Sequence, residues 1–208
     1  DTPRSNFISA IELFWNQWAS DQNLILVVCG SATSWMVNKL LGDKGGLHNR
    51  VTHSIYLAPF SLGETEAFLQ ENRIVLDRHQ IVECYMMLGG TPYYLNMLQP
   101  KLSLAQNINN LFFVENGELR REFDFLFRSL FKDSKNYRKI IELLSKKTKG
   151  MTRQEIIQEC GITDNGKLSE ILENLCNCDF IRRYSSFNKR QREAIYQLTD
   201  LFSLFHLR

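Results

Sequence analysis

The first sixty residues switch between a helical and a strand-like pattern of apolar positions. Apolar residues at spacings of four, three and four predict an amphipathic helix near the start, and these are Phe7, Ile11, Phe14 and Trp18. Ser5 is a suitable cap for this helix, and we expect its apolar stripe to be core. Residues 24–29 are then apolar without interruption, which is typical of a strand buried on both faces of a parallel sheet.

A second strand is predicted over 51–60, where the run VTHSIYLAPF stops at Pro59. Between the two strands we expect a short helix around 35–41 and a loop over the glycine-rich run GDKGGLHNR. Small and hydroxyl-bearing residues at 30–34 follow the first strand, and in open α/β sheets ligands sit beyond the carboxyl ends of strands. The order strand, helix, strand fits a right-handed crossover.

The pattern is almost wholly helical over 61–132. Five helices are expected there, and their signals are the pairs Ser61 with Glu64 and Asp77 with Gln80, the dipeptide Thr91-Pro92, Ser103, and the apolar positions from Leu119 to Leu130. Gly89-Gly90 ends the second of these helices. Because the connections are short, we expect the five helices to pack as a bundle.

Three helices and a hairpin are predicted over 133–199. Apolar positions define helices around 137–144 and 168–175, and Thr152 with Glu155 is a capping box for the helix between them. A basic polar loop at 185–192 separates two strand-like runs, so this order predicts a winged helix-turn-helix. Residues 200–208 are the apolar start of a further helix, and we expect more sequence to follow. The fold class is therefore mainly α with minor β.

Composition limits the class of protein. Of the 208 residues 44% are hydrophobic, enough for packed cores, and neither an uninterrupted apolar run of membrane-spanning length nor a leader-peptide pattern is visible. We therefore expect a cytoplasmic protein that does not bind membranes. The five cysteines are irregularly spaced, which favours reduced core thiols over disulfides or a metal site. The net charge of +2 is unevenly distributed along the chain. Residues 1–132 carry 11 basic and 13 acidic side chains, whereas residues 133–208 carry 14 basic and 10 acidic side chains, so the positive excess lies in the C-terminal part.

Several segments together resemble the archaeal-type ATPases of the AAA+ and STAND P-loop superfamily. They are RSNFISAIELFWNQW, VVCGSATSWM, KGGLHNRV, IYLAPFSLGETEAFL, GGTPYYL and GELRREFDFLFRSLF, and they span essentially the whole chain. The resemblance implies that 1–60 are the end of an α/β P-loop ATPase core, 61–132 a helical lid, and 133–199 a winged-helix domain. In that family the opening segment DTPR follows the Walker B strand, and the Walker A loop lies further upstream.

The chain departs from the family pattern at the phosphate-binding loop. The motif G-x-x-x-x-G-K-[ST], whose backbone amides and lysine hold the phosphates, occurs nowhere in the sequence. ATP and Mg²⁺ are therefore expected in the intact parent protein, and none on this chain alone. The family sheet also places the Walker A strand between 24–29 and 55–58. We expect 1–60 to be a core remnant that other packing, a second chain or upstream sequence supports.

The resemblance also implies site residues, each with a plainer interpretation beside it. Ser31 occupies the sensor 1 position near the γ-phosphate, although a strand end and helix cap would look the same. Arg50 is a candidate arginine finger or an exposed loop arginine. Gly90, Thr91 and Pro92 resemble the lid turn beside the adenine, and they also suit an ordinary helix boundary.

The predicted hairpin carries five positive charges in eleven residues, and these are Arg182, Arg183, Lys189, Arg190 and Arg192. They suit non-specific contacts with DNA phosphates. The helix predicted around 168–175 is the one that would enter the major groove. It carries one lysine, Lys167, and two glutamates, Glu170 and Glu173, and such a face is poorly suited to hydrogen bonding with base edges. The first hypothesis is thus the C-terminal part of an ATPase, inactive alone, whose parent couples ATP hydrolysis to lid motion. The alternative is a winged-helix DNA-binding or regulatory interaction module.

Overall fold

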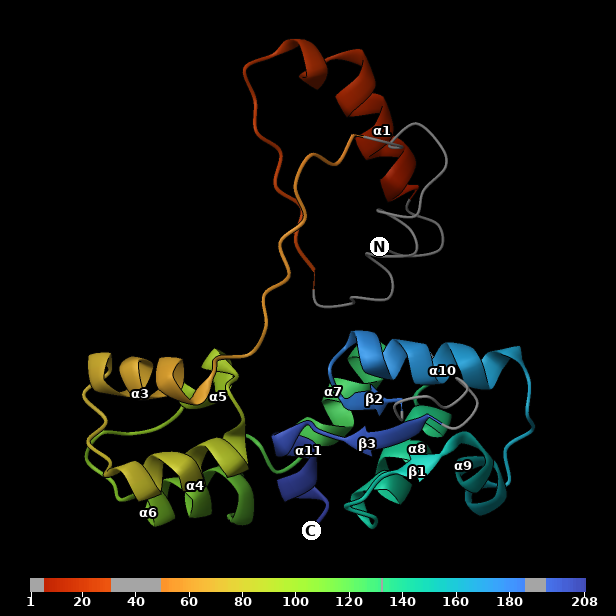
Figure 1. Ribbon diagram of the computed structural model, residues 1–208. Coiled ribbons are helices and arrows are strands. Elements are labelled where there is room, and N and C mark those ends of the chain that lie inside the picture. The colour runs from red at the N-terminus through yellow and green to blue at the C-terminus, as the bar shows by residue number, and fades with distance from the viewer. Residues whose placement is uncertain (1–5, 31–49, 132, 186–193) are drawn as a thin grey trace. The chain divides into compact units, whose positions relative to one another are not determined.

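The computed structural model describes residues 6–30, 50–131, 133–185 and 194–208 (Figure 1). The chain divides into two compact units, Asp1–Tyr56 and Leu57–Arg208, and each is treated by itself. Within the described ranges, no helix combines the length and apolar character needed to cross a bilayer.

The Asp1–Tyr56 unit contains α1 (Phe7–Gln17) and the short 3₁₀ helix η1 (Ala19–Asp21). The predicted first helix is confirmed, but its cap is Asn6, in a left-handed conformation with φ 45°, and Ser5 lies outside the described residues. The expectation that its stripe is core is wrong. No residue of α1 is buried, and Phe14 and Trp18 are 41% and 52% exposed. The reason is that the described part of this unit forms no sheet on which the stripe could pack.

The two strands predicted for this region are absent from the described residues. Neither 24–29 nor 51–60 forms a strand, and Ile25, Val27 and Ile55 are 91%, 80% and 83% exposed. A strand is stable only when its N–H and C=O groups pair with a neighbouring strand, and the described residues of the unit supply none. The prediction of buried parallel strands is therefore wrong for the described residues, and the assignment of 1–60 as a core remnant stays a prediction.

The first half of the Leu57–Arg208 unit is helical. Its elements are α3 (Leu62–Glu71), α4 (Arg78–Leu88), α5 (Pro92–Leu95), α6 (Leu104–Ile108), the π-helix η3 (Asn109–Phe113) and α7 (Glu122–Leu130). The capping boxes at Ser61 and Asp77 are confirmed, and Ser103 forms a third with Gln106. Helix α7 begins at Glu122, later than Leu119, and the Leu119 amide donates to the Leu111 carbonyl at 3.0 Å.

The second half contains the three helices and hairpin predicted for 133–199. Its elements are α8 (Ser134–Ser145), β1 (Met151–Thr152), α9 (Arg153–Cys160), α10 (Gly166–Asn177), β2 (Ile181–Tyr184), β3 (Ile195–Leu198) and α11 (Leu201–His206). The strands form an antiparallel sheet in the order β1-β3-β2. Sequence analysis missed β1, because its two residues run directly into the capping box of α9.

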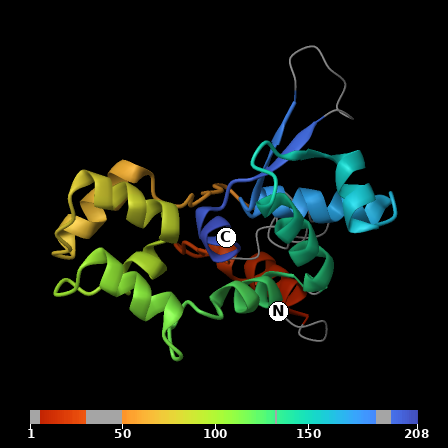
Figure 2. The same cartoon turned by 90° about the horizontal axis from the view of Figure 1, so that it is seen from below.

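Helix α11 packs against both halves of this unit, on α4 and on α8 (Figure 1, Figure 2). Phe202 is 1% exposed, and its ring stacks on Tyr94 with a centroid distance of 4.6 Å. One continuous hydrophobic core therefore includes residues from Leu69 to Phe202. Residues 200–208 are an integral part of this packing. The boundaries predicted after 132 and 199 stay predictions.

Candidate functional site

The turn between α4 and α5 contains the predicted site residues Gly90, Thr91 and Pro92. Gly89 ends α4 with φ 65°, a conformation in which a β-carbon is strained. Thr91 is the extended residue before α5, and Pro92 is at the first helical position. The predicted helix boundary is therefore confirmed, and its two glycines have different functions: Gly89 supplies the backbone conformation, whereas Gly90 permits a close approach.

That close approach joins Gly90 to Phe60, in the segment that leads into α3. The Phe60 amide donates a hydrogen bond to the Gly90 carbonyl at 2.7 Å, and a β-carbon on Gly90 would lie only 1.9 Å from the Phe60 carbonyl oxygen. The Tyr85 hydroxyl donates to that same Phe60 oxygen at 3.0 Å. The Phe60 ring packs on Phe68 of α3 at 5.5 Å. The amide of Phe60 is thus held by the turn and its carbonyl by Tyr85 of α4.

The outer surface of the turn is apolar and aromatic. Pro92 is exposed, and the neighbouring Tyr93 is 64% exposed. Such a surface can stack on a planar group, but it offers no carboxylate, imidazole or thiol for acid–base chemistry. Sequence analysis did not single out Tyr93, although an aromatic residue directly after a proline-initiated turn was a usable signal.

Beneath this surface, Tyr94 holds α5 to α7. Its hydroxyl donates to Glu122 Oε1 at 3.2 Å, and Tyr94 itself is 5% exposed. Burial raises the pKa of Tyr94, and the nearby carboxylate of Glu122 raises it further. Tyr94 therefore keeps its proton and acts as a permanent donor, which positions the turn without taking part in chemistry.

The remaining predicted residues are not brought to this turn by any described contact. Ser31 lies outside the described residues, and Arg50 is exposed in a turn of the Asp1–Tyr56 unit. Arg182 and Arg183 are exposed on β2, whereas Lys189, Arg190 and Arg192 lie outside the described residues. None of these roles is tested by the geometry.

The face of α10 that a recognition helix would present is acidic. Lys167 donates to Asp133 at 2.8 Å, so its charge is already paired. The side chains of Glu170 and Glu173 are exposed. Carboxylates repel DNA phosphates, so this helix is poorly suited to the major groove.

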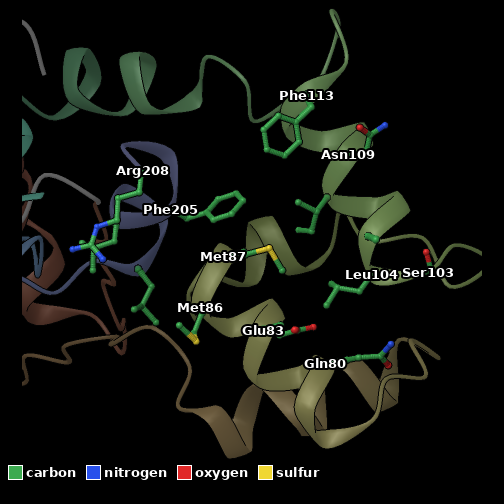
Figure 3. Close-up of a pocket in the computed structure, with 14 residues that line it drawn as sticks. Gln80, Glu83, Met86, Met87, Ser103, Leu104, Asn109, Phe113, Phe205 and Arg208 are labelled. Carbon is green, nitrogen blue, oxygen red and sulfur yellow. The ribbon is translucent and has the colours of Figure 1, made fainter. Parts of the chain in front are cut away.

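A groove on the Leu57–Arg208 unit was not anticipated from the sequence. Its volume is about 870 Å³, and faces of α4, α6, η3 and α11 line it (Figure 3). Helix α4 buries Ile81, Cys84 and Leu88 in the core, yet Met86 and Met87 turn apolar side chains toward the groove. A helix with apolar residues on two faces needs one set of neighbours to cover each face, and the core covers only one face of α4. That signal was present in the sequence.

Comparisons with known proteins give two matches, while no family model matches the chain. The chain is 27% identical over 185 residues to the uncharacterized protein MJECL04 of Methanocaldococcus jannaschii, which is 88% of this chain but 40% of that protein. The Walker-type ATPase PABY2304 of Pyrococcus abyssi has a similar structure, with a TM-score of 0.67 and 19% identity. That likeness covers 99% of this chain and 59% of the other. The chain thus has a fold similar to that of this Walker-type ATPase, and it spans less than two thirds of the length of either protein.

Proposed function

We propose that this chain is the C-terminal part of an AAA+/STAND-type ATPase, comprising the end of the nucleotide-binding core, a helical lid and a winged helix. The observation that carries the proposal is the structural likeness to a Walker-type ATPase over 99% of the chain. The winged-helix assignment is supported by the order α8, β1, α9, α10, β2, β3 and by the antiparallel sheet.

The Asp1–Tyr56 unit is, in this proposal, the incomplete end of a P-loop core. Its two apolar segments, 24–29 and 55–58, would become strands when a third strand carrying the Walker A loop lies between them. The exposure of Ile25, Val27 and Ile55 supports this, because such residues are costly to leave in water. Upstream sequence would supply that strand. The alternative is that a second copy of the same unit covers these exposed apolar segments. Ser31 would then face the γ-phosphate, and ATP with Mg²⁺ would bind the completed protein.

The Gly90 turn is the proposed link between nucleotide and lid. Pro92 and Tyr93 present the surface against which adenine would pack, and Gly90 holds Phe60 in the segment that joins core to lid. A shift of the turn on nucleotide binding or release would therefore move Phe60 with it. This connection gives hydrolysis in the core a direct route to lid motion.

Nucleotide titration tests the proposal. A fluorescent ATP analogue with Mg²⁺ is added to the 208-residue chain and to a chain that also carries the coding sequence upstream of Asp1. We expect binding and hydrolysis in the longer protein only, and loss of hydrolysis with retained binding in its Ser31→Ala variant. Ser61→Ala, a cap substitution at an exposed position, is the control for general loss of stability.

Two results would overturn the proposal. One is ATP turnover by the 208-residue chain alone, which would require a phosphate site of a different kind. The other is an upstream sequence with no Walker A motif and no nucleotide binding in the longer protein.

A further inference from the structure

We propose that the groove lined by α4, α6 and α11, here named the Met86 groove, binds an amphipathic helix of a partner protein that places a lysine or arginine beside Glu83. This site is separate from the nucleotide function proposed above. Three features of the groove carry the inference: the arrangement of its walls, its openness, and the charge on its α4 wall.

The walls of the groove are helix faces with helical spacing. Helix α4 contributes Gln80, Glu83, Met86 and Met87, helix α6 contributes Leu104, Ala105 and Ile108, and α11 contributes Leu201, Leu204 and Phe205, with Arg208 just beyond its end. Within each helix these positions are adjacent or lie three or four residues apart, so each helix presents one face to the same cavity (Figure 3). Three such faces around a common hollow form the concave surface that a further helix fills in a bundle.

The openness of the groove favours a helix over a small molecule. Its volume of about 870 Å³ has room for several large side chains. Met86 and Phe113, which line it, are 59% and 67% exposed, whereas small-molecule sites enclose most of the ligand. Methionine side chains such as those of Met86 and Met87 adapt to varied apolar partners.

The charge in the groove specifies the chemistry of the partner. Glu83 points into the cavity from the α4 wall (Figure 3), and its neighbour His79, 3.5 Å away, is charged only when protonated. On the α11 wall the Arg208 guanidinium donates to the Ser145 carbonyl at 3.2 Å. The α4 wall thus offers an exposed carboxylate, so the occupant should carry a cation beside its apolar anchors, as in other helix-in-groove complexes.

Matched synthetic peptides test this proposal on the 208-residue chain. The probe is a fluorescein-labelled helical peptide of about 14 residues, with leucines at i, i+3, i+4 and i+7 and lysines flanking that stripe; its partner peptide has glutamates in place of the lysines. We expect the lysine peptide to bind with a micromolar Kd, about tenfold more tightly than the glutamate peptide. Met86→Glu should weaken binding at least tenfold, whereas Val75→Glu, at a position 91% exposed and outside the groove, should leave it unchanged.

Charge reversal gives the sharper readout. Glu83→Lys, on an exposed side chain, should reverse the preference between the two peptides while the circular dichroism of the chain stays the same. The proposal is overturned if both peptides bind wild type and Glu83→Lys equally, or if Met86→Glu and Val75→Glu behave alike. It is also overturned if sedimentation shows a homodimer that Met86→Glu dissociates, because a second copy would then occupy the groove.

Discussion

The backbone of Phe60 lies against Gly90, thirty residues further along the chain, closely enough that a single added carbon has no room. The amide of Phe60 bonds the Gly90 carbonyl at 2.7 Å, and the carbonyl of Phe60 occupies the space where a β-carbon of residue 90 would lie. Because of this contact, the segment before α3 and the turn after α4 should move together.

Alanine substitutions at the two neighbouring glycines should destabilise the chain for different reasons. In Gly90→Ala the new carbon would collide with the Phe60 carbonyl, so we expect a loss of about 2–3 kcal/mol in the free energy of unfolding. Gly89→Ala meets open space, but φ 65° with ψ −166° is a backbone conformation essentially restricted to glycine, and it should cost about 1–3 kcal/mol. Urea unfolding measures both losses, and hydrogen exchange at the Phe60 amide should rise more in Gly90→Ala than in Gly89→Ala. Equal exchange at that amide in the two variants would contradict the contact.

The Tyr85 hydroxyl should contribute less than the glycine. Tyr85→Phe removes only the 3.0 Å bond to the Phe60 carbonyl, and we expect a loss of about 1 kcal/mol. Tyr93→Phe, on a side chain that is 64% exposed, is the matched control and should be neutral. Thermal unfolding distinguishes the two, and the prediction fails if both variants melt with wild type.

The stability of the Leu57–Arg208 unit should fall below neutral pH through His206. Its ring stacks on Phe123 at 4.9 Å, and burial lowers the pKa of His206 from 6.5, with Arg138 lowering it further and Asp124 opposing. The unfolded chain therefore binds a proton more tightly than the folded chain. Stability from this group is present above pH 6.5 and is lost as the pH falls from there through the folded pKa.

His206→Phe keeps a stacked ring and removes the titration, so its unfolding midpoint should depend less on pH between about 7 and 5 than that of wild type. The carboxyl of Glu155, whose pKa hydrogen bonds with Lys147 and Thr152 lower to about 2, acts below pH 4.5 and is unchanged by this substitution. Parallel pH profiles for the two proteins would refute the assignment to His206.

Thiol labelling should report whether the core remnant is complete. Cys29 is exposed in this chain, whereas Cys84 is buried and desolvation raises its pKa to about 12. We expect a thiol reagent to modify Cys29 rapidly and Cys84 only after unfolding, with Cys29→Ser as the control. In a chain extended upstream of Asp1, Cys29 should become protected, because a completed sheet would bury its strand. Equal labelling in both proteins would argue against that sheet.

Duplex DNA should bind only non-specifically, with a Kd of about 10–100 µM at physiological salt. Exposed Arg182 and Arg183 can contact phosphates, whereas exposed Glu170 and Glu173 repel them. Replacing both arginines by alanine should lower the slope of log affinity against log salt by about 2. Lys101→Ala, at an exposed lysine outside the predicted winged helix, should not change the slope. A sequence-dependent affinity, measured by fluorescence anisotropy, would instead favour the DNA-binding alternative.

The amino-acid sequence by itself determined the helices of the Leu57–Arg208 unit. Their start signals act within four residues, as in the capping boxes at Ser61, Asp77 and Thr152, so the same interactions form wherever the segment lies. The turn at Gly89-Gly90 could be predicted for the same reason, since glycine and proline restrict the backbone locally.

Tertiary structure decided the features that depend on distant partners. The apolar runs at 24–29 and 51–60 have strand-like sequences, but a ladder requires neighbouring strands, and the described residues of their unit contain none. The contact of Phe60 with Gly90, the packing of α11 on α4 and α8, and the Met86 groove likewise join segments far apart in the chain. Local propensity places a helix or a turn, but only packing determines which surfaces are buried and which stay open to a partner.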